Sequence, residues 1–119
     1  MSERTDQLRE DVRFRVLRQL EIQPAMNQRQ IAAALGVSLG GVNYCINALV
    51  KKGHIKINNF RKSDSKIGYM YVLTPNGAME KMALAHRFLS RKMFEYELLR
   101  SEIEAVKNEF DALNDTAES

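Results

Sequence analysis

The chain has 119 residues, 45% of them hydrophobic and 28% charged, which is enough for one small globular domain with its own core. Its net charge of +3 conceals a basic middle, because residues 24–75 carry seven basic side chains and one acidic one, net +6, between flanks of net 0 and −3. A single cysteine excludes an internal disulfide, and a polar N-terminus without an apolar run of membrane length predicts a soluble, cytoplasmic protein that contacts no membrane.

The first predicted element is a helix over residues 6–22. Its apolar side chains recur at the three- and four-residue spacing of one helical face. They are Leu8, Val12, Phe14, Val16, Leu17 and Leu20. Thr5 is the expected N-cap, and Pro24 marks the end of the helix.

Two short helices follow, and both carry the same start and stop signals. Asn27 is the expected N-cap of the first, where Gln30 completes a capping box, and Gly36 is its left-handed stop. Ser38 is the N-cap of the second, and Gly53 ends it. So tight a glycine turn between two short helices predicts a helix-turn-helix.

A basic hairpin and a long helix complete the chain. Alternating residues predict strands over 54–60 and 67–74, joined by a polar turn over 61–66. Thr74 is the expected N-cap of the long helix, with Pro75 at its first position.

The order of these elements defines the predicted fold class. It is mostly α with a small β-hairpin wing, a winged helix-turn-helix followed by a long C-terminal dimerisation helix. We expect a DNA-binding domain over 1–77, a coiled-coil helix over 78–113 and a frayed tail over 114–119.

The helix after Ser38 is the expected recognition helix. At 100° per residue, Val42, Cys45, Ile46 and Leu49 cluster on a core side. The opposite side, the predicted base-contacting face, consists of Gly40, Asn43, Tyr44, Asn47 and Lys51. Asparagine can pair with adenine, tyrosine can contact phosphate or a thymine methyl, and lysine can reach phosphate. The alternative is a merely solvated face.

The two glycines at the start of this helix require an explanation, because a glycine inside a helix lowers its stability by about 0.8–1.0 kcal/mol relative to alanine. Without a side chain at Gly40, the first turn can approach the DNA backbone, where its N–H groups and the Ser38 hydroxyl bind phosphate. Gly41 points more to the side and is expected to pack against the preceding helix. Neutral drift is the alternative for both.

Other basic residues lie where a winged helix meets DNA. Arg29 falls in the first turn of the second helix, and Arg61, Lys62 and Lys66 fall at the tip of the wing. A basic segment of this kind is typical of a polyanion-binding module, although a solvated basic surface has the same composition.

Two segments, QIAAALGVSLGGVNYCINALVKKGHI and GYMYVLTPNG, resemble the DNA-binding core of MarR-like winged-helix transcriptional regulators. The resemblance covers about residues 8–80, and the finer likeness is to the short subgroup associated with exopolysaccharide (EPS) gene clusters. It implies a bacterial homodimer that binds double-stranded DNA at an inverted repeat, as repressor or activator, with polysaccharide genes as the expected targets.

Neither an enzyme nor a cofactor or metal site is expected. His54 and His86 are isolated, and Cys45 lies toward the core side of its helix. A different class of function stays open, because winged helices also serve as protein–protein adaptors that bind no DNA. Tyr69, Tyr71, Met79 and Phe88 could line a ligand pocket or simply belong to the core.

The long helix carries a heptad pattern from residue 82 onward. Its a and d positions include the predicted dimer seam of Leu89, Tyr96, Leu99, Ile103, Val106, Phe110 and Leu113, which Lys92 interrupts. Glutamates occupy the g positions 95, 102 and 109, while Arg100 and Lys107 occupy e positions. A parallel pair of helices therefore matches opposite charges, whereas an antiparallel pair opposes glutamates. The alternative is a single helix that folds back on its own domain.

Overall fold

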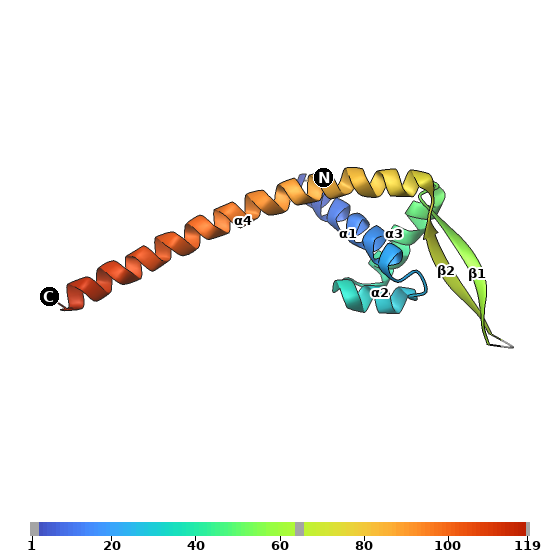
Figure 1. Cartoon of the computed structure of the whole chain (residues 1–119), viewed down its shortest axis with the longest axis horizontal. Coiled ribbons are helices and arrows are strands. Elements are labelled where there is room, and N and C mark those ends of the chain that lie inside the picture. Colours follow the sequence, from blue (N-terminus) through green and yellow to red (C-terminus); the bar gives the residue numbers. More distant parts are fainter. Residues whose placement is uncertain (1–2, 64–65, 119) are drawn as a thin grey trace. The chain divides into compact units, whose positions relative to one another are not determined.

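The computed structural model describes residues 3–63 and 66–118, with the side chains of residues 3, 59–63, 66–69 and 118 outside the description. Figure 1 shows the six elements in chain order. They are α1 (Glu3–Ile22), α2 (Gln28–Leu35), α3 (Leu39–Lys51), β1 (Ile55–Ser63), β2 (Lys66–Leu73) and α4 (Pro75–Glu118). The predicted fold class, a winged helix-turn-helix with a long C-terminal helix, is confirmed.

The chain forms two compact units, Met1–His86 and Arg87–Ser119. All the fully buried side chains lie in the first unit, among the residues whose side chains are described. They come from α1, α2, α3 and the start of α4: Val16, Leu17, Leu20, Ile31, Val42, Ile46, Leu49 and Leu84. The first unit thus has the core of a small domain. This unit extends to His86, and a functional division at residue 77 stays a prediction.

Helix α1 begins earlier than the sequence predicts. It starts at Glu3, so Thr5 lies inside the first turn and its assignment as N-cap is wrong. Leu8, the first residue of the predicted stripe, is exposed, whereas Val16 and Leu20 are buried. The predicted end is correct, since the helix stops at Ile22, two residues before Pro24.

The start and stop signals of α2 and α3 are confirmed atom by atom. Asn27 Oδ1 accepts from the N–H of Gln30, whose Oε1 accepts in turn from the N–H of Asn27, at 2.8 and 2.9 Å. Gly36 ends α2 with φ of 67°, a left-handed conformation that glycine adopts without strain. After α3, Gly53 takes φ of 78°, and the N–H of His54 closes the turn on the Leu49 carbonyl at 2.9 Å.

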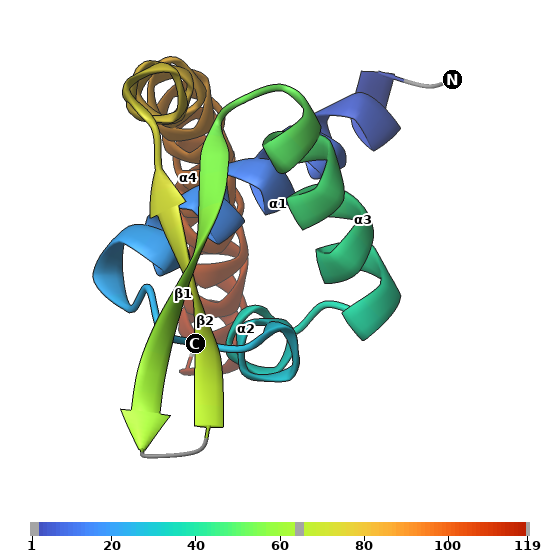
Figure 2. The same cartoon turned by 90° about the vertical axis from the view of Figure 1, so that its right-hand side faces the viewer.

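The wing is an antiparallel hairpin of β1 and β2, and Figure 2 shows the two strands side by side. Strand β1 is longer than predicted and β2 begins one residue earlier, because Arg61 pairs with Ile67 and Ser63 with Lys66 instead of forming a six-residue turn. The register shifts between Arg61 and Ser63, which leaves Lys62 as the extra residue of a bulge. At its base, the Tyr71 N–H donates to the Pro24 carbonyl at 3.1 Å and so joins β2 to the loop before α2.

Helix α4 starts at a tight junction with the end of α3. Thr74 Oγ1 accepts from the N–H of Gly77 at 3.0 Å, as the predicted N-cap should. A Cβ at Gly77 would lie 1.8 Å from the His54 carbonyl oxygen, so only glycine fits there. At its other end, α4 continues to Glu118, so residues 114–118 are helical where the sequence predicts a frayed tail.

Candidate nucleic-acid interface

The amphipathic division of α3 is as the sequence predicts. Val42, Ile46 and Leu49 are buried, and Cys45 is half-buried. Every member of the base-contacting face is exposed, namely Gly40, Asn43, Tyr44, Asn47 and Lys51. Tyr44 is the extreme case, with 77% of its surface accessible. A large aromatic side chain that is exposed to this extent is available to a partner.

The N-terminus of α3 is capped, and this cap limits which groups remain for a ligand. Ser38 Oγ accepts from the N–H of Gly41 at 3.0 Å, which confirms Ser38 as N-cap. A phosphate bound at this end would therefore use the N–H groups of Leu39 and Gly40. Contact of Ser38 or Gly40 with DNA stays a prediction.

The two glycines of the first turn have different surroundings. A Cβ at Gly40 would meet nothing within 4 Å, so packing inside the chain does not require glycine there. A Cβ at Gly41 would meet the Ser38 Oγ at 3.0 Å. The expected packing of Gly41 against α2 is therefore wrong, because its near neighbour is the N-cap of its own helix.

A run of side-chain hydrogen bonds connects the base-contacting face to the rest of the domain. Asn47 Nδ2 donates to Asn43 Oδ1 at 3.2 Å, and Asn43 Nδ2 donates to Gln28 Oε1 at 3.0 Å. Gln28 Nε2 then donates to Tyr71 Oη at 3.4 Å. Sequence reasoning missed Gln28 and Tyr71, since no local pattern reveals partners 15 and 43 residues apart.

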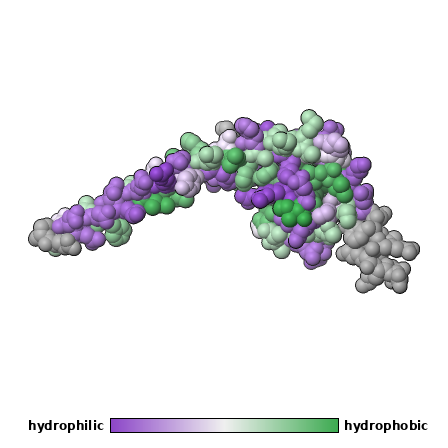
Figure 3. Space-filling view, viewed as in Figure 1, coloured by the Kyte–Doolittle hydropathy of each residue, from purple (hydrophilic) through white to green (hydrophobic). Residues whose placement is uncertain are grey.

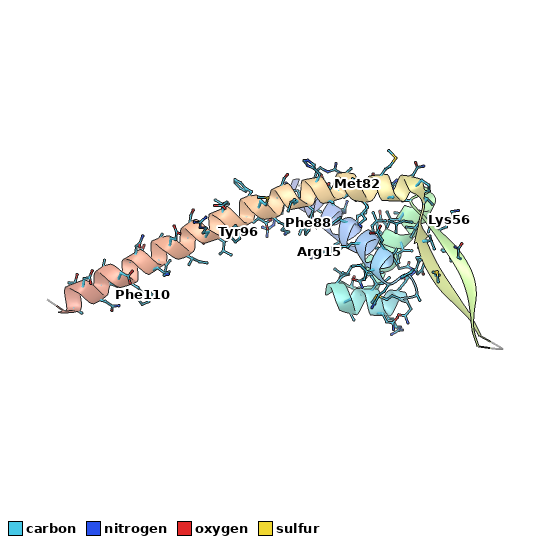
Figure 4. The ribbon with its side chains drawn as sticks, in the orientation of Figure 1. Arg15, Lys56, Met82, Phe88, Tyr96 and Phe110 are labelled. Atoms are coloured by element: carbon cyan, nitrogen blue, oxygen red, sulfur yellow. The ribbon has the colours of Figure 1, made fainter. Side chains whose placement is uncertain are left out.

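The basic residues divide into those whose side chains are described and those of the wing. Arg29 is exposed in the first turn of α2, and Lys51 is exposed at the end of α3. Lys56 is exposed on β1, where Figure 4 labels it. The side chains of Arg61, Lys62 and Lys66 lie outside the described residues, so their expected contacts with DNA stay predictions.

Cys45 has the properties of a core thiol. Desolvation by burial raises its pKa from 9.0 to about 11, against the smaller lowering effects of Arg13 and Lys52. The thiol is therefore protonated at neutral pH, and a protonated thiol is a poor nucleophile. Within the described residues, no group of three or more His, Cys, Asp or Glu side chains is placed to hold a metal ion.

The residues weighed as a ligand pocket do not share one environment. Tyr71 is buried and belongs to the core of the first unit, whereas Met79 is exposed. Phe88 lies in the second unit, with Lys92 Nζ 5.4 Å from the centre of its ring. The side chain of Tyr69 is outside the description. The core interpretation therefore fits Tyr71, and a pocket built from all four stays unsupported.

The second unit carries the predicted dimer seam on its surface. Leu89, Tyr96, Leu99, Ile103, Val106, Phe110 and Leu113 are each between 50 and 68% exposed. Figure 3 shows hydrophobic residues among hydrophilic ones along α4, and Figure 4 shows Tyr96 and Phe110 projecting from the helix. Lys92 Nζ lies 3.1 Å from Glu95 Oε2, and Arg100 Nε lies 3.7 Å from Glu104 Oε1. Such exposed pairs within one helix contribute little, so these charges remain available to a partner helix.

Comparisons with known proteins agree on the fold. Residues 9–56 match the model of a family described as winged helix-turn-helix DNA-binding. The structure is similar to the PcaV transcriptional regulator from Streptomyces coelicolor in complex with its natural ligand, with TM-score 0.63 and 20% identity over 90% of this chain and 73% of that one. It is also similar to a MarR/EmrR family transcriptional regulator from an Acinetobacter species, with TM-score 0.56 and 18% identity over 83% and 74% of the two chains.

A third similar structure contains nucleic acid. It is a mutant of MepR from Staphylococcus aureus bound to an oligodeoxyribonucleotide, with TM-score 0.54 and 17% identity over 83% of this chain and 78% of that one. No curated protein matches the sequence. Among the described residues no single helix is long and apolar enough to cross a membrane, although α2 and α3, bent by 114°, pass that test as a pair.

Proposed function

We propose that this chain is a sequence-specific regulator of transcription that binds double-stranded DNA as a homodimer at an inverted repeat. One observation carries the proposal. The second helix of a helix-turn-helix has an exposed face of Gly40, Asn43, Tyr44, Asn47 and Lys51, while its apolar residues Val42, Ile46 and Leu49 are buried in the core. A helix of this kind fits the major groove, where its exposed side chains reach base edges.

Charge supports DNA over a protein partner. The net +6 of residues 24–75 includes Arg29, Lys51 and the three basic residues of the wing. A protein adaptor has no need of such a concentration, whereas a phosphate backbone attracts it. If about six basic side chains neutralise phosphates, the logarithm of the binding constant should fall with the logarithm of salt concentration at a slope of roughly −5 per binding unit.

Dimerisation through α4 is the second part of the proposal. The seam leaves seven apolar side chains at the surface, and water is an unfavourable environment for so continuous a stripe. In a parallel pair, Glu95 of one chain meets Arg100 of the other, and Glu102 meets Lys107. An antiparallel pair would oppose glutamates. Each exposed ion pair stabilises the dimer by at most about 1 kcal/mol. The charges therefore favour the parallel orientation, while burial of the apolar seam provides most of the affinity.

The descriptions of the similar structures support DNA binding and a role in transcription. One similar protein is described as bound to an oligodeoxyribonucleotide, and two others are described as transcriptional regulators. A symmetric dimer would place its two recognition helices on half-sites about one turn of DNA apart. Regulation of polysaccharide genes in the cytoplasm stays a prediction from the sequence resemblance.

The decisive experiment is selection of bound fragments from random duplex DNA by the full chain. We expect enrichment of an inverted repeat whose half-sites are about one helical turn apart. Enrichment of a single half-site would retain DNA binding and contradict the dimer. Recovery of no preferred sequence, together with binding that does not respond to salt, would contradict DNA binding and favour the adaptor function.

A further inference from the structure

Three amide side chains, those of Asn47, Asn43 and Gln28, form a head-to-tail run that begins on the base-contacting face. Each amide donates through its nitrogen to the next residue, and the oxygens of Asn43 and Gln28 both accept. The run starts at Asn47 and ends at the hydroxyl of Tyr71, a buried residue of β2. The orientation of the whole run is therefore anchored in the core.

The two asparagines of this face are not equivalent. Asn43 uses its oxygen toward Asn47 and its nitrogen toward Gln28, so both ends of its amide are engaged. Asn47 makes one side-chain hydrogen bond among the described residues, as a donor. Its Oδ1 and its second N–H therefore remain open on an exposed surface.

An open amide edge of this kind matches adenine. In the major groove, adenine offers the N6 amino group as a donor and N7 as an acceptor. Asn47 Oδ1 can accept from N6 while the second N–H of Nδ2 donates to N7, and the bond to Asn43 stays in place. Asn43 would have to present the same edge with an oxygen and a nitrogen that each already have a partner within the chain.

We propose that Asn47 is the residue that reads an adenine in each half-site, and that Asn43 and Gln28 are positioning residues that hold its amide. This inference rests on the proposed DNA-binding function and goes further, because it assigns a base to one residue and a supporting role to two others. A side chain held by its neighbours loses less conformational freedom on binding, which favours the single correct pairing.

The test measures base preference at one position of the selected site. The adenine of one half-site is replaced by each other base, and the ratio of dissociation constants is measured for the full-length wild-type protein and its variants. A bidentate contact is worth about 1–3 kcal/mol of discrimination, so Asn47→Ala should reduce the ratio by about 5- to 150-fold. Lys51→Ala is the control, and it should weaken binding to all four sequences equally.

The positioning role has its own pair of matched variants. Gln28→Met keeps the length of the side chain and removes the acceptor for Asn43, so the preference should fall at the same base position. Gln28→Glu keeps that acceptor and should retain the preference, even if its charge weakens binding to every sequence. A role in stability alone would lower the melting temperature without separating these two variants in base preference.

The outcomes distinguish this inference from the function on which it rests. If no sequence is enriched by the wild-type protein, the DNA-binding function and the inference fail together. If a sequence is enriched and Asn47→Ala keeps the full preference at every position, the inference alone is wrong. It is equally wrong if Asn43→Ala abolishes the preference while Asn47→Ala retains it, because Asn43 would then be the reader.

Discussion

Helix α1 and the part of α4 after His86 carry the same kind of sequence signal and have opposite environments. Both show apolar residues at three- and four-residue spacing. In α1, Val16 and Leu17 are completely buried, whereas Leu99 and Ile103 of α4 are more than half exposed. The spacing determines which face of a helix is apolar, but it does not say what covers that face.

This difference separates the two tasks of the molecule. The apolar face of α1 is covered by other elements of the same chain and stabilises the fold. The apolar face of α4 after His86 is exposed in this chain, and we propose that a second copy, which has the matching charges, covers it. Substitutions in the first region should therefore change unfolding, and substitutions in the second should change assembly and DNA affinity.

The largest expected effect comes from removing the dimer seam. A chain that ends at Phe94 keeps the first unit, Met1–His86, and loses Tyr96 and all the seam residues after it. It should be a folded monomer in sedimentation at micromolar concentration. Its affinity for the inverted repeat should fall by about 10²- to 10⁴-fold, because two half-sites are no longer held by one molecule.

A pair of point variants in the full chain checks this result without truncation. Ile103→Asp places a charge in the seam and should also give a monomer, whereas Ser101→Asp places the same charge on another face of α4 and should leave a dimer. A dimeric truncated chain, or equal behaviour of the two aspartate variants, would contradict assembly through this seam.

The next largest effect is expected in the core of the first unit. Leu17→Ala removes a completely buried side chain and should lower the free energy of unfolding by about 2–5 kcal/mol. Leu99→Ala removes the same atoms from an exposed site and should leave the unfolding of the first unit unchanged at concentrations where the protein is monomeric. Urea denaturation of both variants measures the difference. Equal losses would mean that the part of α4 after His86 also contributes to the stability of the first unit.

Alanine substitutions of two glycines of the first unit should change stability by smaller amounts and in opposite directions. Gly77→Ala forces a Cβ against the His54 carbonyl, and overpacking of this kind costs about 1–3 kcal/mol. Gly40→Ala meets open space in a helix and should stabilise the fold by about 0.8–1.0 kcal/mol, while it weakens DNA binding. Thermal unfolding and binding isotherms measure the two effects. Unchanged DNA binding by Gly40→Ala would remove the reason proposed for that glycine.

The remaining effect concerns pH and is absent at neutral pH, where both the folded and the unfolded chain keep the thiol protonated. Burial raises the pKa of Cys45 from 9.0 to about 11, so the folded chain favours the neutral thiol. Between those values the unfolded chain loses the proton and the folded chain keeps it, so stability should fall as pH rises from about 9 to about 11. Denaturation of the wild type and Cys45→Ala across this range measures the contribution. Parallel curves would show that the thiol is not desolvated in solution.

Local chemistry made most of the first unit predictable from the sequence. The capping box of Asn27, the left-handed stop at Gly36 and the caps at Ser38 and Thr74 each depend on residues within a few positions of one another. The amphipathic division of α3 follows from spacing alone. All the residues that such a local signal needs are neighbours in the sequence. The order of helices and strands could therefore be predicted from the sequence.

Features that depend on distant residues could not be predicted. The bonds from Gln28 to Asn43 and Tyr71 join three elements, and nothing in the sequence near Gln28 indicates them. The wing was predicted too short because its polar residues resemble a turn, although the hairpin register extends through them. The contacts of Arg61, Lys62 and Lys66 with DNA stay predictions, because they depend on a partner molecule.

The junction between α3 and α4 has a consequence for how the domain opens. Thr74 Oγ1 holds the first turn of α4 and donates to the Gly53 carbonyl, and the Thr74 N–H donates to the His54 carbonyl at 3.0 Å. The hydroxyl and the backbone N–H of Thr74 therefore connect the residues that follow α3 to the first turn of α4. The amides of His54, Thr74 and Gly77 should exchange with solvent in one opening event. Thr74 is thus one direct link by which a force on the start of α4 reaches the end of α3.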